Sequence, residues 1–332
     1  MAETKRLLVL TRDRGGAPFR QRIEPYLPLL AERRIEAEVV ELAAGARARW
    51  GQFRPACQFD GVLLHRKTLT AWDALALGDA PPLIYDFDDA VMYQARSPEA
   101  PHPGRERRFY RTVARSELAI AGSPNLETHA SLAGAARVEV IPTGLETGAF
   151  QPKEGGRSPE QVRLVWIGSA STLRQLTTLG PVFEAVGRHV PGAVLRVIAD
   201  ARLQVPGLEV ENVPWSLEAE ARLLAEADIG IAPLPDTPYT RGKCGFKVLQ
   251  YMAAGLPVVA SPVGVNAEYV QPDVTGLHAT TAEEWTAAVE RLAADPALRE
   301  RMGQAGRRRV EKEFDFSVLG PKVCRLIEET LA

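Results

Sequence analysis

Residues 232–264 read APLPDTPYTRGKCGFKVLQYMAAGLPVVASPVG, and their pattern predicts the end of a strand, a loop, a helix and a second strand. An apolar strand ends near Leu234, and a basic loop rich in glycine follows it. A helix is predicted over residues 246–254, because Gly255 and Pro257 stop it. The apolar run VVA then starts another strand. This order predicts a parallel pair of strands, because parallel strands need a long crossover connection such as a helix.

The same alternation of short apolar runs and longer amphipathic stretches extends through the whole chain. It predicts an α/β protein with two Rossmann-like, doubly wound domains, whose ligand-binding edges lie at the carboxyl ends of the strands. The runs are RLLVLT (6–11), AEVVEL (37–42), GVLLHR (61–66), PPLIYDF (81–87), LAIAGS (118–123) and VEVIPT (138–143), then VRLVWIGS (162–169), AVLRVIAD (193–200), LEVENV (208–213), ADIGIAPL (227–234) and LPVVASP (256–262).

A polar segment divides the two series of runs. Residues 151–161, QPKEGGRSPEQ, are rich in glycine and proline and are predicted to be the linker. We therefore predict an N-terminal domain over 1–150 and a C-terminal domain over 162–314. Residues 315–332 are predicted to form a terminal helix that packs on the domains.

Composition excludes several classes of protein. The 332 residues are 45% hydrophobic and carry a formal net charge of −2, so no overall charge favours nucleic acid. The three cysteines, Cys57, Cys244 and Cys324, have no metal-binding spacing and do not suggest a disulfide framework. No apolar run reaches the roughly 18 residues of a membrane span. We expect a cytoplasmic protein, with peripheral membrane contact through the basic segment 104–115 as a less favoured option.

The loop before the helix at 246–254 is the strongest candidate for ligand binding. Lys243 and Lys247 lie four residues apart around Gly245, where backbone amides and the positive end of the helix dipole favour an anion. A diphosphate fits this arrangement. The alternative is a solvated helix start with exposed lysines.

In this region the chain resembles glycosyltransferase family four. The resemblance rests on GFKVLQYMAAGLPVVAS, PVGVNAEYV and the segment from VTGLHA to VEKEF, and more weakly on WIGSAS and VEVIPTGLETGAF. It implies the GT-B fold, with two domains that face each other across a cleft, and transfer with retention of anomeric configuration. It also implies a nucleotide-diphosphate sugar as co-substrate, bound by the C-terminal domain (162–314) while the N-terminal domain (1–150) lies on the acceptor side, with no cofactor or metal required. The family's two donor-site glutamates are replaced by Gly242 and Gln250.

The resemblance also assigns donor-binding residues. Gly168, Ser169 and Arg174 match the phosphate loop after the first strand of the C-terminal domain, and Gly245 with Phe246 supplies amides at the helix start. Trp215 falls where the family places the base, and a core tryptophan is an equally good interpretation. The full donor set is Gly168, Ser169, Arg174, Trp215, Lys243, Gly245, Phe246, Lys247 and Gln250.

Two segments of the N-terminal half complete the expected site. Gly15 and Gly16 are predicted to form a turn after the first strand. Together with Arg20 they make a candidate acceptor-binding or closure loop, and the alternative is an exposed arginine-rich surface without a binding role. Asp86, Asp88 and Asp89 end the strand PPLIYDF. Asp88 and Asp89 are the candidate catalytic carboxylates, and Lys247 is the third candidate catalytic residue. For the aspartates, the alternatives are a divalent metal site and a helix cap.

The sequence therefore predicts an enzyme, a glycosyltransferase that moves a hexosyl or related sugar to a hydroxyl of a small-molecule, glycan or lipid-linked acceptor. The departing diphosphate is stabilised electrostatically. The alternatives are a nucleotide-sugar epimerase or phosphorylase of the same fold, or a catalytically degenerate nucleotide-binding subunit.

Overall fold

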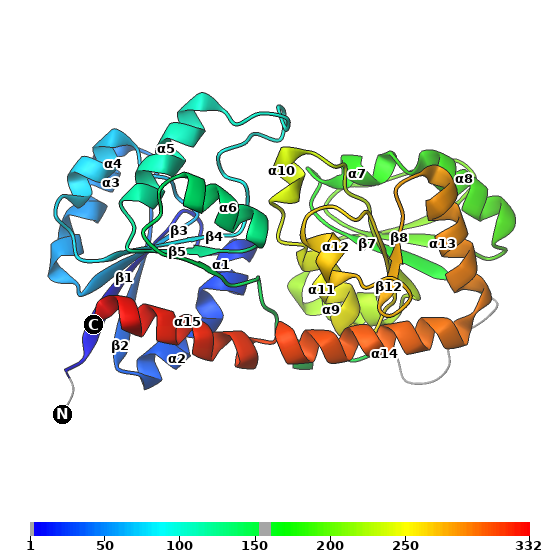
Figure 1. The fold of residues 1–332 in the computed structure, drawn as a ribbon. Coiled ribbons are helices and arrows are strands. Elements are labelled where there is room, and N and C mark those ends of the chain that lie inside the picture. The colour runs from blue at the N-terminus through cyan, green and yellow to red at the C-terminus, as the bar shows by residue number, and fades with distance from the viewer. Residues whose placement is uncertain (1–2, 153–160) are drawn as a thin grey trace. The chain divides into compact units, whose positions relative to one another are not determined.

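The computed structural model describes residues 3–152 and 161–332 (Figure 1). The chain divides into two compact units. Unit 1 comprises Met1–Gly144, Thr237–Cys244 and Phe316–Ala332, and unit 2 comprises Leu145–Asp236 and Gly245–Asp315. Most of the predicted linker, residues 153–160, lies outside the described residues.

Unit 1 contains a six-stranded parallel sheet in the order β2-β1-β3-β4-β5-β6. Its strands coincide with the six apolar runs of the first series. They are β1 (Lys5–Thr11), β2 (Ile35–Glu41), β3 (Gly61–His65), β4 (Leu83–Phe87), β5 (Leu118–Ala121) and β6 (Val138–Val140). Its helices are α1 (Ala17–Arg22), α2 (Leu27–Glu32), α3 (Ala46–Phe53), α4 (Ala71–Leu77), α5 (Pro103–Ala114), α6 (Pro124–Leu132), α10 (Pro238–Arg241) and α15 (Phe316–Leu331), with 3-10 turns at Glu24–Tyr26 and Arg54–Gln58.

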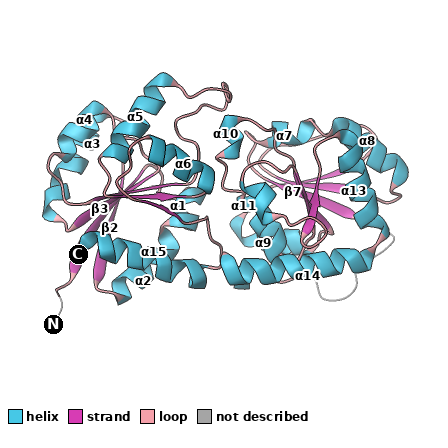
Figure 2. Cartoon of the chain, in the orientation of Figure 1, coloured by secondary structure: helices cyan, strands magenta, loops and turns pink. Residues whose placement is uncertain are grey.

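Both faces of this sheet are buried, which explains why its strands read as apolar runs. Alternate residues point to opposite faces. Leu8 and Tyr85 pack with the helices α3 to α6, whereas Leu7 and Ile84 pack with α1, α2 and α15. The helices lie on either side of the strands in Figure 2. The terminal helix α15 therefore completes unit 1.

The strand order of unit 1 reverses between β1 and β3. The connection from β1 to β2 passes through α1 and α2 on one face, and the connection from β2 to β3 passes through α3 on the other. The loops that leave β1 and β3 therefore diverge at the carboxyl edge of the sheet. Open α/β sheets bind their ligands at such a switch point.

Unit 2 repeats the design, with a six-stranded parallel sheet in the order β12-β11-β10-β7-β8-β9. Its switch point lies between β7 and β10. The strands are β7 (Arg163–Ile167), β8 (Val194–Ile198), β9 (Glu209–Val213), β10 (Ile229–Ala232), β11 (Val258–Ala260) and β12 (Gly276–His278). The helices are α7 (Leu173–Thr177), α8 (Gly180–His189), α9 (Leu217–Ala225), α11 (Phe246–Ala253), α12 (Val265–Tyr269), α13 (Ala282–Ala294) and α14 (Pro296–Glu313), with a 3-10 turn at Thr147–Ala149.

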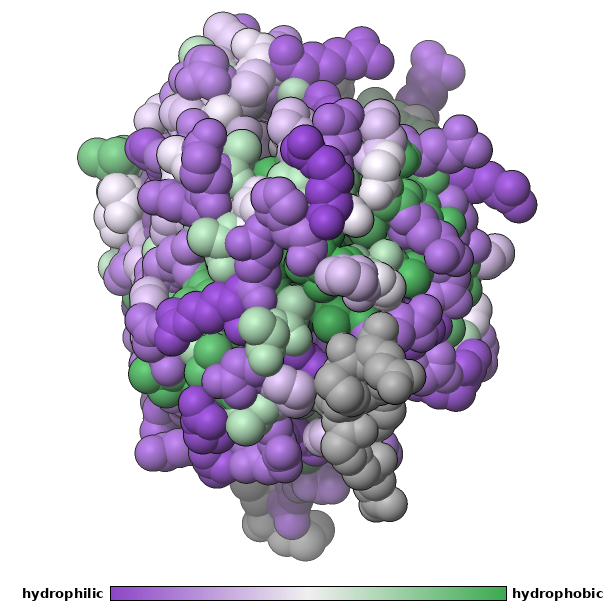
Figure 3. All heavy atoms as spheres, turned by 90° about the vertical axis from the view of Figure 1, so that its right-hand side faces the viewer, coloured by the Kyte–Doolittle hydropathy of each residue, from purple (hydrophilic) through white to green (hydrophobic). Residues whose placement is uncertain are grey.

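The sheet of unit 2 is also covered on both faces. Leu164 and Trp166 pack with α8 and α13, whereas Val165 and Ile167 pack with α9 and α11. Figure 3 views unit 2 from the side of α8 and α13, where hydrophilic side chains predominate and hydrophobic ones show in patches between them. The predicted α/β fold with two doubly wound sheets is confirmed.

The division differs from the sequence-based boundaries at residues 237–244. These residues lie within the predicted C-terminal domain, but they belong to unit 1. Tyr239 packs against the core of unit 1, and its amide donates a hydrogen bond to the carbonyl of Pro98 at 3.1 Å. At Gly242 a Cβ atom would lie 2.7 Å from the Cβ of Ala90. Close packing against unit 1 therefore explains why no glutamate side chain occupies this position.

Candidate functional site

A pocket of about 970 Å³ opens at the carboxyl edge of the unit 1 sheet. Its walls come from the loops after β1, β2, β3 and β4 and from the first turns of α5, as the switch-point topology predicts. Six cationic side chains line it, namely Arg12, Arg49, Arg66, Lys67, Arg105 and Arg108, against the carboxylates Asp13 and Asp89. The pocket is therefore strongly basic.

His65 lies at the floor of this pocket, at the end of β3. Its side chain is almost fully buried, and Nδ1 lies 3.0 Å from Oγ1 of Thr11 at the end of β1. Nε2 has no hydrogen-bond partner among the described residues. Burial lowers the pKa of His65, so the ring is neutral near pH 7. The switch point thus presents a neutral imidazole to the pocket.

Asp86 does not face this pocket. It forms a paired salt bridge with Arg22 of α1, with Nε to Oδ1 at 2.9 Å and Nη2 to Oδ2 at 2.6 Å, and both side chains are at most 5% exposed. Arg22 also donates to the carbonyl of Ile141 at 3.0 Å. Burial by itself lowers the pKa of Arg22, but the Asp86 carboxylate outweighs it and the pKa is raised. Asp86 therefore holds α1 against the sheet.

Asp88 and Asp89 face cations. Nε of Arg66 lies 3.2 Å from Oδ1 of Asp88, and Nη2 lies 3.3 Å from Oδ2 of Asp89. Arg66 adopts φ of 57°, a left-handed conformation that costs a non-glycine residue about 1 kcal/mol or more. The ion pairs compensate for that strain. Asp88 is 6% exposed and Asp89 21%, so Asp89 is the more accessible carboxylate of the pair.

Lys243 lies beside Asp89, with Nζ 3.1 Å from each carboxylate oxygen. The ammonium also lies 2.9 Å from the hydroxyl of Tyr239 and 4.4 Å from the centre of its ring. Burial lowers the pKa of Lys243, but the charge of Asp89 outweighs burial and the pKa is raised. Asp89 and Tyr239 thus hold the Lys243 ammonium within unit 1. The position of Lys243 in the basic loop of the sequence does not indicate this pairing.

The predicted phosphate loop of unit 2 gathers around one aromatic ring. Nζ of Lys247, in the first turn of α11, lies 4.4 Å from the ring centre of the fully buried Trp166. A Cβ at Gly168 would lie 2.6 Å from the same ring, so only glycine lets the backbone approach it. Trp166 belongs to β7, beside the switch point of this sheet. Lys247 and Gly168 are therefore brought together by a residue absent from the predicted site.

Gly245 caps the start of α11 in the left-handed conformation, with φ 64° and ψ 18°. A Cβ there would lie 2.8 Å from Val265 and 3.0 Å from Tyr269. Both restrictions require glycine. Phe246 follows as the first helical residue, and Gln250 lies in the same helix, only 4% exposed.

The remaining predicted donor residues lie in two loops of unit 2. Oγ of Ser169 lies 2.8 Å from that of Ser171 in the turn after Gly168, and Arg174 is exposed on α7. The indole N–H of Trp215 donates to Glu220 at 2.8 Å, and its ring packs against the core near α9. These contacts agree with a core-packing role for Trp215.

The predicted closure loop lies beside the unit 1 pocket. Gly16 is the N-cap of α1, and a Cβ there would lie 2.5 Å from the carboxylate of Asp13. Arg20 donates to the carbonyl of Gly15. Arg12 and Asp13 of the preceding turn line the pocket.

Sequence reasoning missed part of the pocket. Arg105 and Arg108 belong to the basic segment 104–115, which the sequence did not connect with a ligand site, yet both line the pocket from the first turns of α5. Their spacing of three residues on one helix was a usable indication. Within the described residues, no group of three or more His, Cys, Asp or Glu side chains could hold a metal ion. None of the described helices combines the length and apolarity that a membrane crossing needs.

Comparisons with known proteins agree with the fold. Residues 156–295 match the family model described as Glycosyl transferases group 1. The MMP alpha-(1->4)-mannosyltransferase of Mycolicibacterium hassiacum is 29% identical over 218 residues, which cover 59% of this chain and 49% of that protein. The D-inositol 3-phosphate glycosyltransferase of Actinosynnema mirum is 29% identical over 195 residues, 50% of this chain and 45% of that protein. The chain spans about half the length of these curated relatives.

Solved structures extend the likeness to nearly the whole chain. Sucrose-phosphate synthase from Thermosynechococcus elongatus has a TM-score of 0.77 at 15% identity and covers 98% of both chains. Anabaena HepE in complex with UDP-glucose has a TM-score of 0.72 at 15% identity and covers 98% of this chain and 100% of that one. The resemblance inferred from the loop and helix at 246–254 is thereby confirmed. Residues 156–295 are thus similar to the Glycosyl transferases group 1 family, and the chain has a two-domain GT-B fold.

Proposed function

We propose that this protein transfers a sugar from a nucleotide-diphosphate sugar to an acceptor hydroxyl, with retention of anomeric configuration. The observation that carries the proposal is the position of Lys247 over Trp166, beside Gly168, at the start of α11. A cation, unpaired helix amides and a loop without side-chain bulk are what a diphosphate requires. Anabaena HepE, which has a similar fold, binds UDP and UDP-glucose in its solved structures.

In this mechanism the protein acts mainly through electrostatics. Lys247 and the amides around Gly245 and Gly168 stabilise the charge that develops on the diphosphate as its bond to the sugar breaks. The acceptor hydroxyl attacks on the face that the diphosphate leaves, and a departing phosphate oxygen takes the hydroxyl proton. In unit 1, Asp89 accepts a hydrogen bond from the acceptor, and Asp88 holds Arg66 in place.

A thermal-shift screen tests donor binding. The purified protein is heated with UDP, GDP, ADP, dTDP and CDP and with their sugar conjugates, with and without magnesium. One nucleotide should raise the melting temperature selectively, because a ligand that binds only the folded state stabilises it. No shift with any nucleotide contradicts the proposal.

Lys247→Met tests the phosphate contact. A hydrogen bond to a charged group contributes roughly 1.5–3 kcal/mol, so the dissociation constant for the nucleotide should rise about 10-fold to 150-fold. Methionine retains apolar contact with Trp166, so folding should persist. The control is Lys312→Met, an exposed lysine of α14. Equal affinities in the two variants contradict the assignment.

Product analysis separates the alternatives. A transferase releases nucleoside diphosphate and forms a glycoside only when an acceptor hydroxyl is present. An epimerase converts its nucleotide sugar without an acceptor, and a phosphorylase forms sugar phosphate from inorganic phosphate. A degenerate subunit binds the nucleotide without turnover.

A further inference from the structure

The unit 1 pocket contains cations that the protein itself does not neutralise. Arg105 donates to the carbonyl of Tyr93 at 2.8 Å, and Arg108 donates to the carbonyl of Gly104 at 2.9 Å. Neither guanidinium has a carboxylate partner among the described residues, and the same is true of Arg12. Backbone carbonyls occupy only part of the donor capacity of a guanidinium, which has five N–H groups.

The other cations of the pocket share their carboxylates. Asp73 accepts from Nε of Arg49 at 2.9 Å and from Nζ of Lys67 at 2.8 Å, so one negative charge serves two positive ones. Burial lowers the pKa of Lys67, and so do the positive charges of Arg49 and Arg12. Asp73 raises this pKa, but the net shift is downward. The positive charge of this wall is therefore incompletely balanced, and an anion would relieve it.

His65, which lines the pocket, adds a buried polar atom. Nε2 of His65 is buried without a partner among the described residues, while Nδ1 is fixed by Thr11. A buried polar atom normally has a hydrogen-bond partner, and a ligand hydroxyl can supply one here. The pocket volume of about 970 Å³ lies at the upper end of the usual range for small-molecule sites, so a sugar-sized ligand with a charged substituent fits.

We propose that the acceptor is a small molecule with a phosphate or carboxylate group, held by Arg12, Arg105 and Arg108 while His65 contacts one of its hydroxyls. This inference rests on the proposed transferase function. It narrows the acceptor to an anionic polyol or sugar, because a neutral glycan would leave the three guanidinium groups unpaired.

The first experiment measures binding without turnover. Glucose 6-phosphate, glucose and inorganic phosphate are each titrated into the full chain, alone and saturated with the nucleoside diphosphate from the screen. We expect the two phosphates to bind in both states and glucose to bind at least tenfold more weakly than glucose 6-phosphate. If the nucleotide does not bind but the phosphates do, the proposed function fails and the anion site stands. If neither phosphate binds, this inference is overturned.

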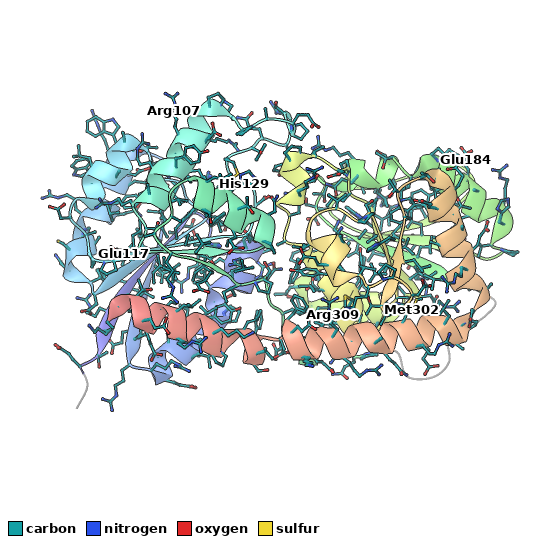
Figure 4. The ribbon with its side chains drawn as sticks, in the orientation of Figure 1. Arg107, Glu117, His129, Glu184, Met302 and Arg309 are labelled. Carbon is teal, nitrogen blue, oxygen red and sulfur yellow. The ribbon has the colours of Figure 1, made fainter. Side chains whose placement is uncertain are left out.

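The matched variants are Arg105→Gln/Arg108→Gln and Arg107→Gln. Arg107 is exposed on α5, points outward in Figure 4, and donates to the carbonyl of Pro103 much as Arg108 donates to that of Gly104. It does not line the pocket. The double variant should weaken phosphate binding at least tenfold, with nucleotide affinity unchanged, and Arg107→Gln should match the wild type. Equal phosphate affinity in all three proteins overturns the inference.

Arg12→Gln repeats the phosphate-binding test from a different element, the loop after β1, so a folding defect in α5 cannot decide the outcome.

A turnover assay then compares paired acceptors: glycerol with glycerol 3-phosphate, glucose with glucose 6-phosphate, and inositol with inositol phosphate. We expect the anionic member of at least one pair to be used at least tenfold more efficiently, with its KM raised in the Arg105→Gln/Arg108→Gln variant. Preferential use of the neutral members overturns the inference.

Two further outcomes would also overturn it. If the nucleotide displaces inorganic phosphate and the double variant weakens nucleotide binding, the pocket serves the donor. If the double variant loses binding to phosphatidylglycerol vesicles while soluble phosphates have no effect on any variant, the basic wall faces a membrane surface instead.

Discussion

Replacing Asp86 with Asn should unfold unit 1 far more easily. The change removes the negative charge beside the Arg22 guanidinium, which is 4% exposed and whose other acceptors are neutral, the Ile141 carbonyl at 3.0 Å and Oγ1 of Thr143 at 3.4 Å. Breaking one side of a buried ion pair costs about 3–5 kcal/mol, because the other charge stays buried. With a urea dependence of about 2 kcal/mol per M, the unfolding midpoint should fall by about 1.5–2.5 M.

Urea unfolding followed by circular dichroism measures this midpoint, and hydrogen exchange of a peptide that covers β4 assigns the transition to unit 1. Glu139→Gln is the control, because its salt bridge with Arg137 is about 40% exposed on each side and should hardly move the midpoint. The double variant Arg22→Met/Asp86→Leu should lose less stability than Asp86→Asn, since no charge remains buried.

A shift below about 0.5 M for Asp86→Asn, with β4 exchange unchanged, would refute this reasoning. Asp86 would then be available for a ligand, as the metal hypothesis requires. Unchanged nucleotide affinity in the folded variant is expected, since Lys247 and Gly168 belong to unit 2.

Three further predictions concern the two candidate sites. Gly245→Ala should lower the free energy of unfolding by about 1–3 kcal/mol and weaken nucleotide binding, because alanine would have to adopt a left-handed φ of 64° with its Cβ 2.8 Å from Val265. Urea unfolding measures the stability and calorimetry the affinity, and wild-type affinity would contradict this prediction. Burial lowers the pKa of His65 in the folded state, so as pH falls below about 6.5 the unfolded state binds a proton at this residue before the folded state does. His65 should therefore lower the free energy of unfolding below about pH 6.5. Unfolding midpoints from pH 7.5 to 5.5 should fall more for the wild type than for His65→Gln, and parallel curves would refute the assignment. Asp89→Asn should reduce kcat at least tenfold without changing nucleotide affinity, because Lys243 loses its ion-pair partner; normal steady-state turnover would remove Asp89 from the mechanism.

The order of strands and helices could be read from the sequence because both sheets are buried on both faces. Runs such as LLVL (7–10) and LVWI (164–167) have to be apolar at every position to fit between two layers of helices. The strand β12, Gly276–His278, was not predicted because its sequence GLH contains a single apolar side chain, Leu277, and so forms no apolar run. The glycine-rich loop also predicted the start of α11 correctly, since Gly245 adopts a conformation that other residues avoid.

The candidate sites could be predicted only in part. Strand-end positions placed Asp88 and Asp89 near a ligand-binding edge, because parallel topology by itself fixes where that edge lies. The same rule grouped Asp86 with them, although a side chain within a strand points to one face of the sheet. Asp86 shares the face of Ile84, where α1 brings in Arg22.

The sequence by itself determined the two doubly wound sheets and the glycine-rich start of α11, since these depend on local patterns of apolar residues, glycine and proline. Only the tertiary structure decided which charges meet. Arg22 and Asp86 are 64 residues apart, and Lys243 and Asp89 are 154 apart. Such pairs form when packing brings distant segments together, so no local pattern records them. The basic pocket of unit 1 is the functional consequence, because its charge depends on which cations the folded chain leaves without carboxylates.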